Sequence, residues 1–137
     1  MSRYCTVKTQ FKDANALIAA LMETGGWKIS QIEVHQQPQH LYGYRGDVRE
    51  ETAHVIIRRK HVGGSSNDIG FVREADGNHT AIISQYDASK YGETWLASLK
   101  GNYAYHKVRQ DQESRGRVVS RERGENGRQR IVVTGYR

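Results

Sequence analysis

Residues 58–71, RRKHVGGSSNDIGF, hold the side chains whose types and spacing best suit binding chemistry. Three cations and a histidine precede a glycine–serine turn, whose backbone N–H groups can form a concave anion site. Guanidinium and ammonium groups would add charge-assisted donors. We therefore expect this segment to contribute an anion-binding site formed by Arg58, Arg59, Lys60, His61, Ser66 and Asn67. The alternative is a plain hairpin loop, in which Gly63 or Gly64 takes positive φ and Asn67 or Asp68 caps local amides.

A second group of candidates lies in the segment KGNYAYHKVRQ, residues 100–110. Aromatic rings stack on bases and cations neutralise phosphates, so Tyr103, His106 and Lys107 are candidates for the same anion site. His106 also fits a hydrogen-bonded histidine on the core side of a helix. The arginines that follow could instead form a salt-bridged surface, because carboxylates are interspersed among them: Asp111, Glu113, Glu122 and Glu125.

No enzyme signature is present. Gly63-Gly64 is followed by Ser-Ser-Asn-Asp rather than by Gly-Lys-Ser/Thr opening a helix, which excludes a P-loop. The histidines and the single cysteine lack metal-ligand spacing, and Ser65, His61 and Asp68 share one loop without a nucleophile-elbow motif. We therefore predict no catalytic residue, no cofactor and no metal, and we favour a non-enzymatic role over the alternative of a hydrolase or nucleotide-handling enzyme without a familiar motif.

The excess positive charge is concentrated at one end of the chain. Residues 1–99 carry 11 Lys+Arg and 11 Asp+Glu, whereas residues 100–137 carry 10 and 4, so the net charge of +6 lies in the last 38 residues. Such a charge favours attraction of polyanions. The single cysteine, Cys5, is expected to be a small buried hydrophobe and fits a reducing, cytoplasmic compartment. No segment is apolar enough to predict a membrane span.

The pattern of apolar residues predicts strands alternating with two helices. Asp13 is expected to cap the first helix, Pro38 to end a strand, and Asp76-Gly77 to form a tight turn. The expected strands are residues 3–8, 28–36, 53–61, 68–74, 79–86, 117–123 and 128–136, with a strand or turn at 41–47 and a turn at Asn126-Gly127. The expected helices are residues 13–24 and 90–115, ended by Gly25-Gly26 and Gly116.

These elements predict a single α+β domain over residues 1–137. Residues 3–60 and 79–136 both read strand, helix, strand, strand, which allows a βαββ duplication with two helices on one face of a mainly antiparallel sheet. A period of 3.6 places part of the second helix toward the core, namely Trp95, Leu96, Leu99, Tyr103, His106 and Gln110. Tyr105 and Val108 fall on the opposite, exposed side.

Four segments together resemble the hypothetical chloroplast reading frame thirty-five family, a domain of unknown function in cyanobacteria, algal plastids, other bacteria and phages. They are LYGYRGD (41–47), VIIRRKHVGGSSNDIGF (55–71), AIISQYD (81–87) and YAYHKV (103–108). The resemblance implies a shared α+β domain and carries no activity or cofactor with it. It draws attention to the residues that match the family's most recognisable segment: Arg58, Arg59, Lys60, Ser66, Asn67, Asp68 and Gly70.

Two functions follow as expectations. The first is an accessory domain that binds an anionic partner, either nucleic acid, a nucleotide or an acidic protein surface, in one cleft shared by residues 58–68 and 103–109. The second is a structural or adaptor protein that forms a homo-oligomer or contacts another protein in a phage, plastid or cyanobacterial assembly. In both cases the expected compartment is the cytoplasm, the host cytoplasm if a phage encodes the chain, or the stroma if a plastid does.

Overall fold

The structure is a computed structural model that describes residues 2–124 and 128–136. Its elements run in the order β1 (Tyr4–Lys8), α1 (Ala14–Gly25), η1 (Ile29–Gln31), β2 (Glu33–Tyr42), β3 (Val48–Ile57), α2 (Arg59–Val62), β4 (Ile69–Arg73), β5 (His79–Ser84), η2 (Asp87–Ser89), α3 (Glu93–Glu113), β6 (Arg117–Arg123) and β7 (Gln129–Tyr136). Five strands form an antiparallel sheet in the order β1-β5-β4-β3-β2, and β6 pairs with β7 alone. The predicted α+β class is confirmed. The expected turn at Asn126-Gly127 lies outside the described residues.

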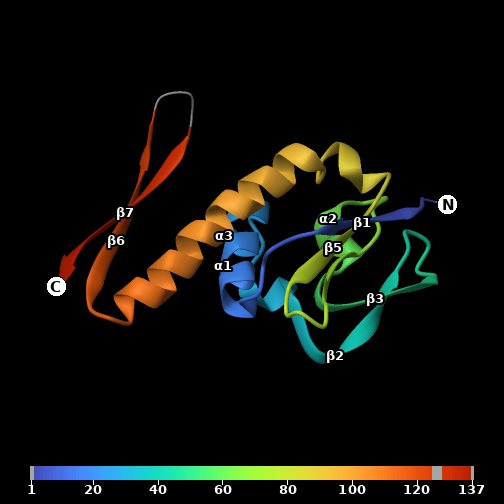
Figure 1. Ribbon diagram of the computed structural model, residues 1–137. Coiled ribbons are helices and arrows are strands. Elements are labelled where there is room, and N and C mark those ends of the chain that lie inside the picture. The colour runs from blue at the N-terminus through green and yellow to red at the C-terminus, as the bar shows by residue number, and fades with distance from the viewer. Residues whose placement is uncertain (1, 125–127, 137) are drawn as a thin grey trace.

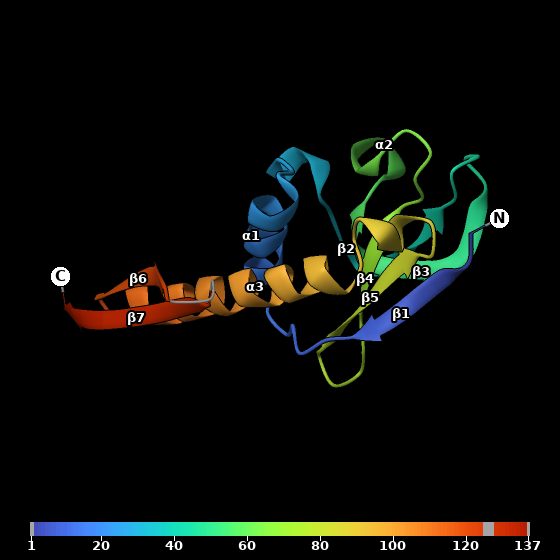
Figure 2. The same ribbon diagram turned by 90° about the horizontal axis from the view of Figure 1, so that it is seen from above.

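The main core lies between one face of the sheet and the two long helices (Figures 1 and 2). Alternate residues of β3, β4 and β5 point toward the helices, including the cross-strand pair Val55 and Phe71. Leu17 and Leu21 of α1 and Leu99 of α3 fill the space above them with no exposed surface. Burying each such side chain contributes about 1.5–3 kcal/mol. The core thus holds α1 and α3 on the same face of the sheet.

The other face of the sheet carries a smaller apolar cluster. Tyr4, Leu41 and Ile56 are buried there. Gly70 of β4 lies under this cluster, since an added β-carbon would come within 2.6 Å of the Ala53 β-carbon. The cluster joins the outer strands β1 and β2 to the centre of the sheet.

The first helix follows its sequence signals. Asp13 adopts an extended conformation, and its Oδ1 accepts a hydrogen bond from the Ala16 N–H at 3.0 Å. Gly26 ends the helix with φ of 72°, in the left-handed region that glycine tolerates. The predicted start and end of this helix are confirmed.

The second long helix also occupies its predicted range, and Gly116 follows it with φ of 79°. Trp95 and Tyr103 pack against the core, as expected. Tyr105 was expected to be exposed but is half-buried, because the Arg121 guanidinium lies over its ring at 3.4 Å from the centroid. A cation–π contact from β6 therefore covers the outer side of α3.

Four local expectations are wrong. The strand expected over residues 28–36 begins only at Glu33, because Ile29–Gln31 form the short helical turn η1. Strand β2 runs through Pro38, which lies within the register shift between Val34 and Gln39 on an edge strand, where proline removes no ladder hydrogen bond. The strand expected over residues 53–61 ends at Ile57, and Arg59–Val62 form a short helical turn instead. Cys5 is exposed rather than buried, because β1 is the outermost strand of the sheet.

The order strand, helix, strand, strand recurs in β1-α1-β2-β3 and β5-α3-β6-β7. The two units nevertheless pair differently. β2 and β3 extend the main sheet, whereas β6 and β7 form a separate hairpin that folds back along α3. In Figures 1 and 2 this hairpin lies at the far end of α3 from the sheet. The two units therefore share the same order of elements but do not form equivalent sheets.

Candidate anion-binding site

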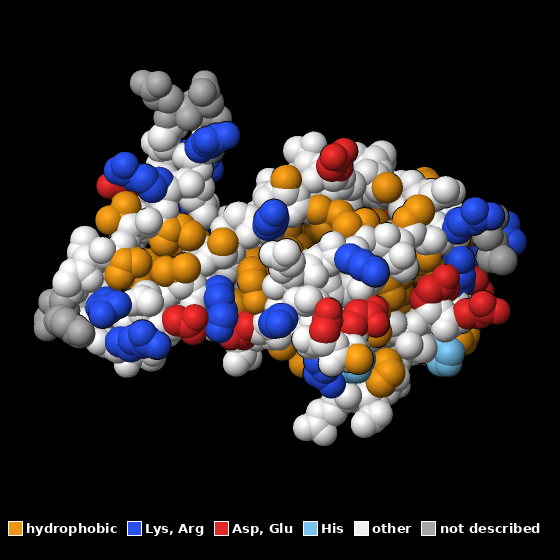
Figure 3. All heavy atoms as spheres, in the orientation of Figure 1, with side chains coloured by type: hydrophobic (Ala, Val, Ile, Leu, Met, Phe, Trp, Pro, Cys, Tyr) orange, Lys and Arg blue, Asp and Glu red, His pale blue; other side chains and the backbone are white. Residues whose placement is uncertain are grey.

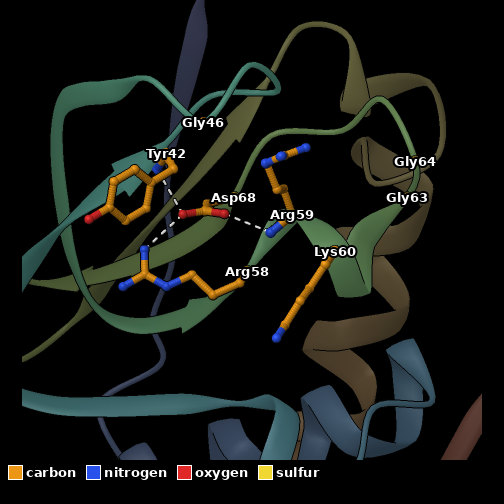
Figure 4. Close-up of a pocket in the computed structure, with 8 residues that line it drawn as sticks. All are labelled: Tyr42, Gly46, Arg58, Arg59, Lys60, Gly63, Gly64 and Asp68. Carbon is orange, nitrogen blue, oxygen red and sulfur yellow. Dashed lines mark hydrogen bonds and ion pairs between the residues drawn. The ribbon is translucent and has the colours of Figure 1, made fainter.

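A cavity of about 550 Å³ opens where the ends of β2 and β3 meet the loop before β4 (Figure 4). Three of its lining residues are glycines, and three are the consecutive cations predicted from the sequence. The full lining is Tyr42, Gly46, Arg58, Arg59, Lys60, Gly63, Gly64 and Asp68. Its volume falls within the range of about 300–1,000 Å³ of small-molecule sites.

Asp68 organises this cavity, and its carboxylate is almost completely buried. Oδ2 accepts hydrogen bonds from the Tyr42 backbone N–H at 2.7 Å and from Arg58 Nη1 at 2.8 Å. Oδ1 accepts the Arg59 backbone N–H at 2.6 Å, at the start of α2. One side chain thus fixes the end of β2, the end of β3 and the turn that carries the cations. This bond to Arg59 also gives a physical reason why the chain leaves the strand conformation at residue 58.

Arg58 is a structural cation. Its Nε and Nη2 donate to the two carboxylate oxygens of Glu33 at 2.8 and 2.9 Å, while Nη1 donates to Asp68 and to the His40 carbonyl. Its guanidinium also lies over the Tyr42 ring, 5.1 Å from the centroid. The hydrogen bonds from Arg58 lower the pKa of Glu33, which keeps that carboxylate ionised. Because its donors are used inside the protein, Arg58 shapes the site rather than meeting a ligand.

Asn67 belongs to a buried polar network. Its Oδ1 accepts the Tyr44 N–H at 3.0 Å, and its Nδ2 donates to Ser84 Oγ at 2.9 Å. Asp87 Oδ2 accepts from both the Asn67 backbone N–H and Ser84 Oγ. This satisfied network pins the loop to the turn after β2 and to β5, so Asn67 is a positioning residue. The expectation that Asn67 or Asp68 caps local amides is wrong, because their side chains accept from the distant amides of Tyr44, Tyr42 and Arg59.

In the glycine–serine turn, glycine is required for close packing and not for a left-handed backbone. Gly63 has φ of 172°, which is extended backbone, and Gly64 is not among the described glycines with positive φ. The expectation of positive φ at one of them is therefore wrong. Gly63 is needed for space, because an added β-carbon would lie 2.7 Å from Ser66 Oγ. Ser66 is buried under this turn and does not line the cavity.

Arg59 and Lys60 differ from every other charged group at this site. Within residues 2–124 and 128–136, neither side chain forms a hydrogen bond or an ion pair. Figure 4 shows them leaving the start of α2 in different directions. With Arg58, Glu33 and Asp68 counted as well, the charges are three positive and two negative, a sum of +1. The site therefore keeps two cations with unused donors beside a scaffold of Arg58, Glu33 and Asp68 whose charges sum to −1.

The remaining predicted site residues lie elsewhere. His61 turns away from the cavity, and its Nδ1 lies 3.3 Å from Gln31 Nε2. Tyr103 OH accepts two backbone N–H groups at the start of α1, and His106 Nε2 lies 2.8 Å from Glu23 Oε1. Lys107 lines a different groove, on the β1 side of α3. The expected single cleft shared by residues 58–68 and 103–109 is therefore not formed.

Several cations of the last third of the chain are held in ion pairs. Lys107 contacts Asp13 and Asp111, Arg109 contacts Glu113, Arg121 contacts Glu23, and Arg130 contacts Glu122. This is the salt-bridged surface that the sequence offered as the alternative. Exposed pairs of this kind are screened by water and add little to the stability of the fold. The excess charge of this segment is thus spread over the outer surface instead of gathering at one site.

The fold and the site together define a small α+β domain with a glycine-lined, cation-bearing cavity, and the chain belongs to a family of proteins of unknown function, DUF1257. The family model matches residues 29–132, which include the cavity, α3 and most of the β6–β7 hairpin. No curated protein and no solved structure matches the chain. Across the described residues, no helix is long and apolar enough to cross a bilayer, and no three His, Cys, Asp or Glu side chains gather to hold a metal ion.

Proposed function

We propose that this chain is a small, non-enzymatic, single-domain accessory protein that binds a phosphate-bearing ligand through Arg59 and Lys60. One observation carries the proposal: within the described residues these two cations have no partner, whereas Arg58 beside them is fully paired. Ordering a cation without a partner brings the fold no electrostatic stabilisation. A ligand anion would supply that partner, because Arg binds phosphate oxygens as a planar fork and Lys binds them as a point charge.

The surroundings favour a nucleotide among the anionic partners that the sequence allows. Gly46, Gly63 and Gly64 leave room beside the cations for a bulky group. The Tyr42 ring lines the same cavity and is 39% exposed, so it offers an aromatic surface for a base. The cavity volume suits one nucleotide rather than a long polymer.

We further infer that the chain is a DUF1257 protein of the hypothetical chloroplast reading frame thirty-five type, because the segment at residues 55–71 resembles that family. The compartment that fits a single cysteine is reducing, namely the cytoplasm, a phage host's cytoplasm or the plastid stroma. A role in assembly, the second function suggested by the sequence, would use other surfaces, namely the exposed face of the sheet or the Tyr105–Val108 side of α3.

Isothermal titration at low salt tests the proposed ligand site. The probes are pyrophosphate, ATP and an eight-nucleotide single strand of thymidylate. We expect ATP to bind most tightly. We expect Arg59→Gln and Lys60→Gln each to weaken ATP binding about tenfold or more, because a hydrogen bond to a charged group contributes about 1.5–3 kcal/mol.

Lys100→Gln is the matched control, since Lys100 is exposed on α3 and lies outside the cavity. It should leave the affinity for ATP unchanged. Raising the salt concentration should weaken binding of all three probes. Equal loss of binding in Lys100→Gln, or no binding of any probe at low salt, would refute the proposal.

A further inference from the structure

The sheet has one edge that is open to another strand. β1 is the outermost strand beside β5. The Thr9 N–H donates to the His79 carbonyl and the Gln85 N–H donates to the Arg3 carbonyl, so the odd-numbered residues of β1 are the ones bonded to β5. Antiparallel pairing alternates, and the backbone N–H and C=O groups of Tyr4, Thr6 and Lys8 therefore point outward.

The opposite edge of the sheet is protected. β2 contains Pro38, which has no N–H, and its pairing with β3 shifts register at two places. Proline and bulges are the devices that keep a strand edge from pairing with another chain. β1 has neither: its five residues pair with β5 in continuous register, without a proline.

An apolar groove of about 630 Å³ runs beside the open edge. The side chain of Val7 points to the helix side of the sheet, yet it is 43% exposed because α3 does not cover β1 fully. Figure 3 shows hydrophobic side chains at the surface in this part of the molecule, with Lys and Arg among them. The groove is formed by Val7, Phe11, Leu96, Ala97, Ala104 and Val108.

The charged side chains that line the groove indicate which kind of segment it would bind. Lys8, Lys100 and Lys107 line it together with Glu93. Lys107 is paired with two aspartates, whereas Lys8 and Lys100 have no ion pair within the described residues. A segment with acidic side chains would therefore complete the groove. A second copy of this chain would bring the same lysines to the same place, which disfavours pairing of β1 with itself.

We propose that the β1 edge and this groove receive an extended, acidic and apolar segment of a partner protein, which adds a sixth strand to the sheet. Its backbone would bond to the outward groups of Thr6 and Lys8. Because side chains alternate along a strand, every second one would enter the groove and contact Leu96 and Ala97. The side chains between them would point to the other face of the sheet, where carboxylates would meet Lys8, which alternates with Val7 along β1. This site is separate from the cavity at Arg59 and Lys60.

The test uses the full chain and two capped eight-residue peptides, one alternating valine with glutamate and the other alternating valine with lysine. Fluorescence anisotropy measures binding, and amide hydrogen exchange followed by NMR locates it. We expect the glutamate peptide to bind at least tenfold more tightly than the lysine peptide. We expect it to slow exchange of the Thr6 and Lys8 amides.

Two exposed positions on α3 provide matched variants. Ala97→Glu places a carboxylate in the groove and should weaken binding of the glutamate peptide at least tenfold, whereas Ser98→Glu adds the same charge outside the groove and should not. Thr6→Pro removes an outward N–H and should also weaken binding.

Equal binding of both peptides, no binding at millimolar concentration, or equal effects of Ala97→Glu and Ser98→Glu would each overturn the proposal. Self-association that Thr6→Pro abolishes would overturn it as well, because the edge would then serve a second copy. Arg59→Gln should leave peptide binding unchanged, which separates this result from that of the ATP titration.

Discussion

Replacing Asp68 by asparagine tests the scaffold of the cavity. The carboxylate of Asp68 accepts three hydrogen bonds, two at Oδ2 and one at Oδ1. Asparagine has almost the same shape but offers one oxygen and one NH₂ group. If its oxygen serves Tyr42 and Arg58, the Arg59 N–H faces a second donor. If the amide is turned over, Tyr42 and Arg58 face that donor instead.

The cost of Asp68→Asn follows from these contacts. A buried donor without an acceptor costs about 1–3 kcal/mol, and a hydrogen bond to a charged group is worth about 1.5–3 kcal/mol. Together they predict a loss of about 3–5 kcal/mol, similar to breaking a buried ion pair. Since small domains are stable by only about 5–15 kcal/mol, this is a large fraction of the free energy of unfolding.

Urea denaturation of the wild type, Asp68→Asn and Asp111→Asn measures this loss. Asp111 is half-exposed and pairs with Lys107 on the surface of α3, so Asp111→Asn should cost less than about 1 kcal/mol. If Asp68→Asn stays within about 1 kcal/mol of the wild type, Asp68 does not hold the strand ends together. The reasoning about the cavity would then be wrong.

Three further predictions concern other parts of the fold. Burial lowers the pKa of His79 and of His54, so the unfolded chain takes up protons before the folded protein does as the pH falls below about 6.5. The free energy of unfolding is therefore full above that pH and falls below it by about 1.4 kcal/mol per pH unit per histidine. In urea titrations at several pH values, His79→Asn should make this fall less steep. Gly70→Ala should cost about 1–3 kcal/mol by overpacking, whereas Gly64→Ala, whose β-carbon has nothing within 4 Å, should be nearly neutral in thermal denaturation; equal effects would contradict the packing described for β4. Tyr103→Phe removes the acceptor of two backbone N–H groups before α1 and should cost about 1–3 kcal/mol in urea, and an unchanged midpoint would count against that contact.

Local sequence signals correctly predicted the elements whose stabilising contacts lie within a few residues of one another. Asp13 caps α1 through a bond three residues away, and Gly26 and Gly116 end their helices with positive φ. The tight turn at Asp76-Gly77 also formed, with Gly77 at φ of 88°. In each case the residue type acts on neighbouring backbone groups, so the sequence alone carries the information.

Features set by distant partners could not be predicted. Pro38 was expected to end a strand, yet an edge position makes it harmless, and the strand order was not visible in the sequence. The basic half of the third expected strand became α2, because Asp68 accepts the Arg59 N–H from nine residues away. Tyr105 was expected to be exposed, but Arg121 returns from β6 to cover it.

The sequence grouped the candidate cations but could not assign a role to each of them. The sequence placed Arg58, Arg59 and Lys60 together, and all three line the cavity. Residue type could not show that Arg58 forms ion pairs with Glu33 and Asp68 while Arg59 forms none within the described residues. One signal was available: Asn67 and Asp68 directly precede the apolar run IGF, which is typical of buried polar residues that position a loop.

The central claim is that Arg59, and not Arg58, is free to meet an anion. Side-chain NMR of the arginine Nε–H groups during a pyrophosphate titration tests it directly, with assignments from Arg59→Gln and from Arg58→Gln where that variant folds. We predict that the Arg59 signal shifts with saturation while the Arg58 signal, which reports the bond to Glu33, stays in place. A shift at Arg58, or no shift at Arg59 at saturating pyrophosphate, would contradict the account.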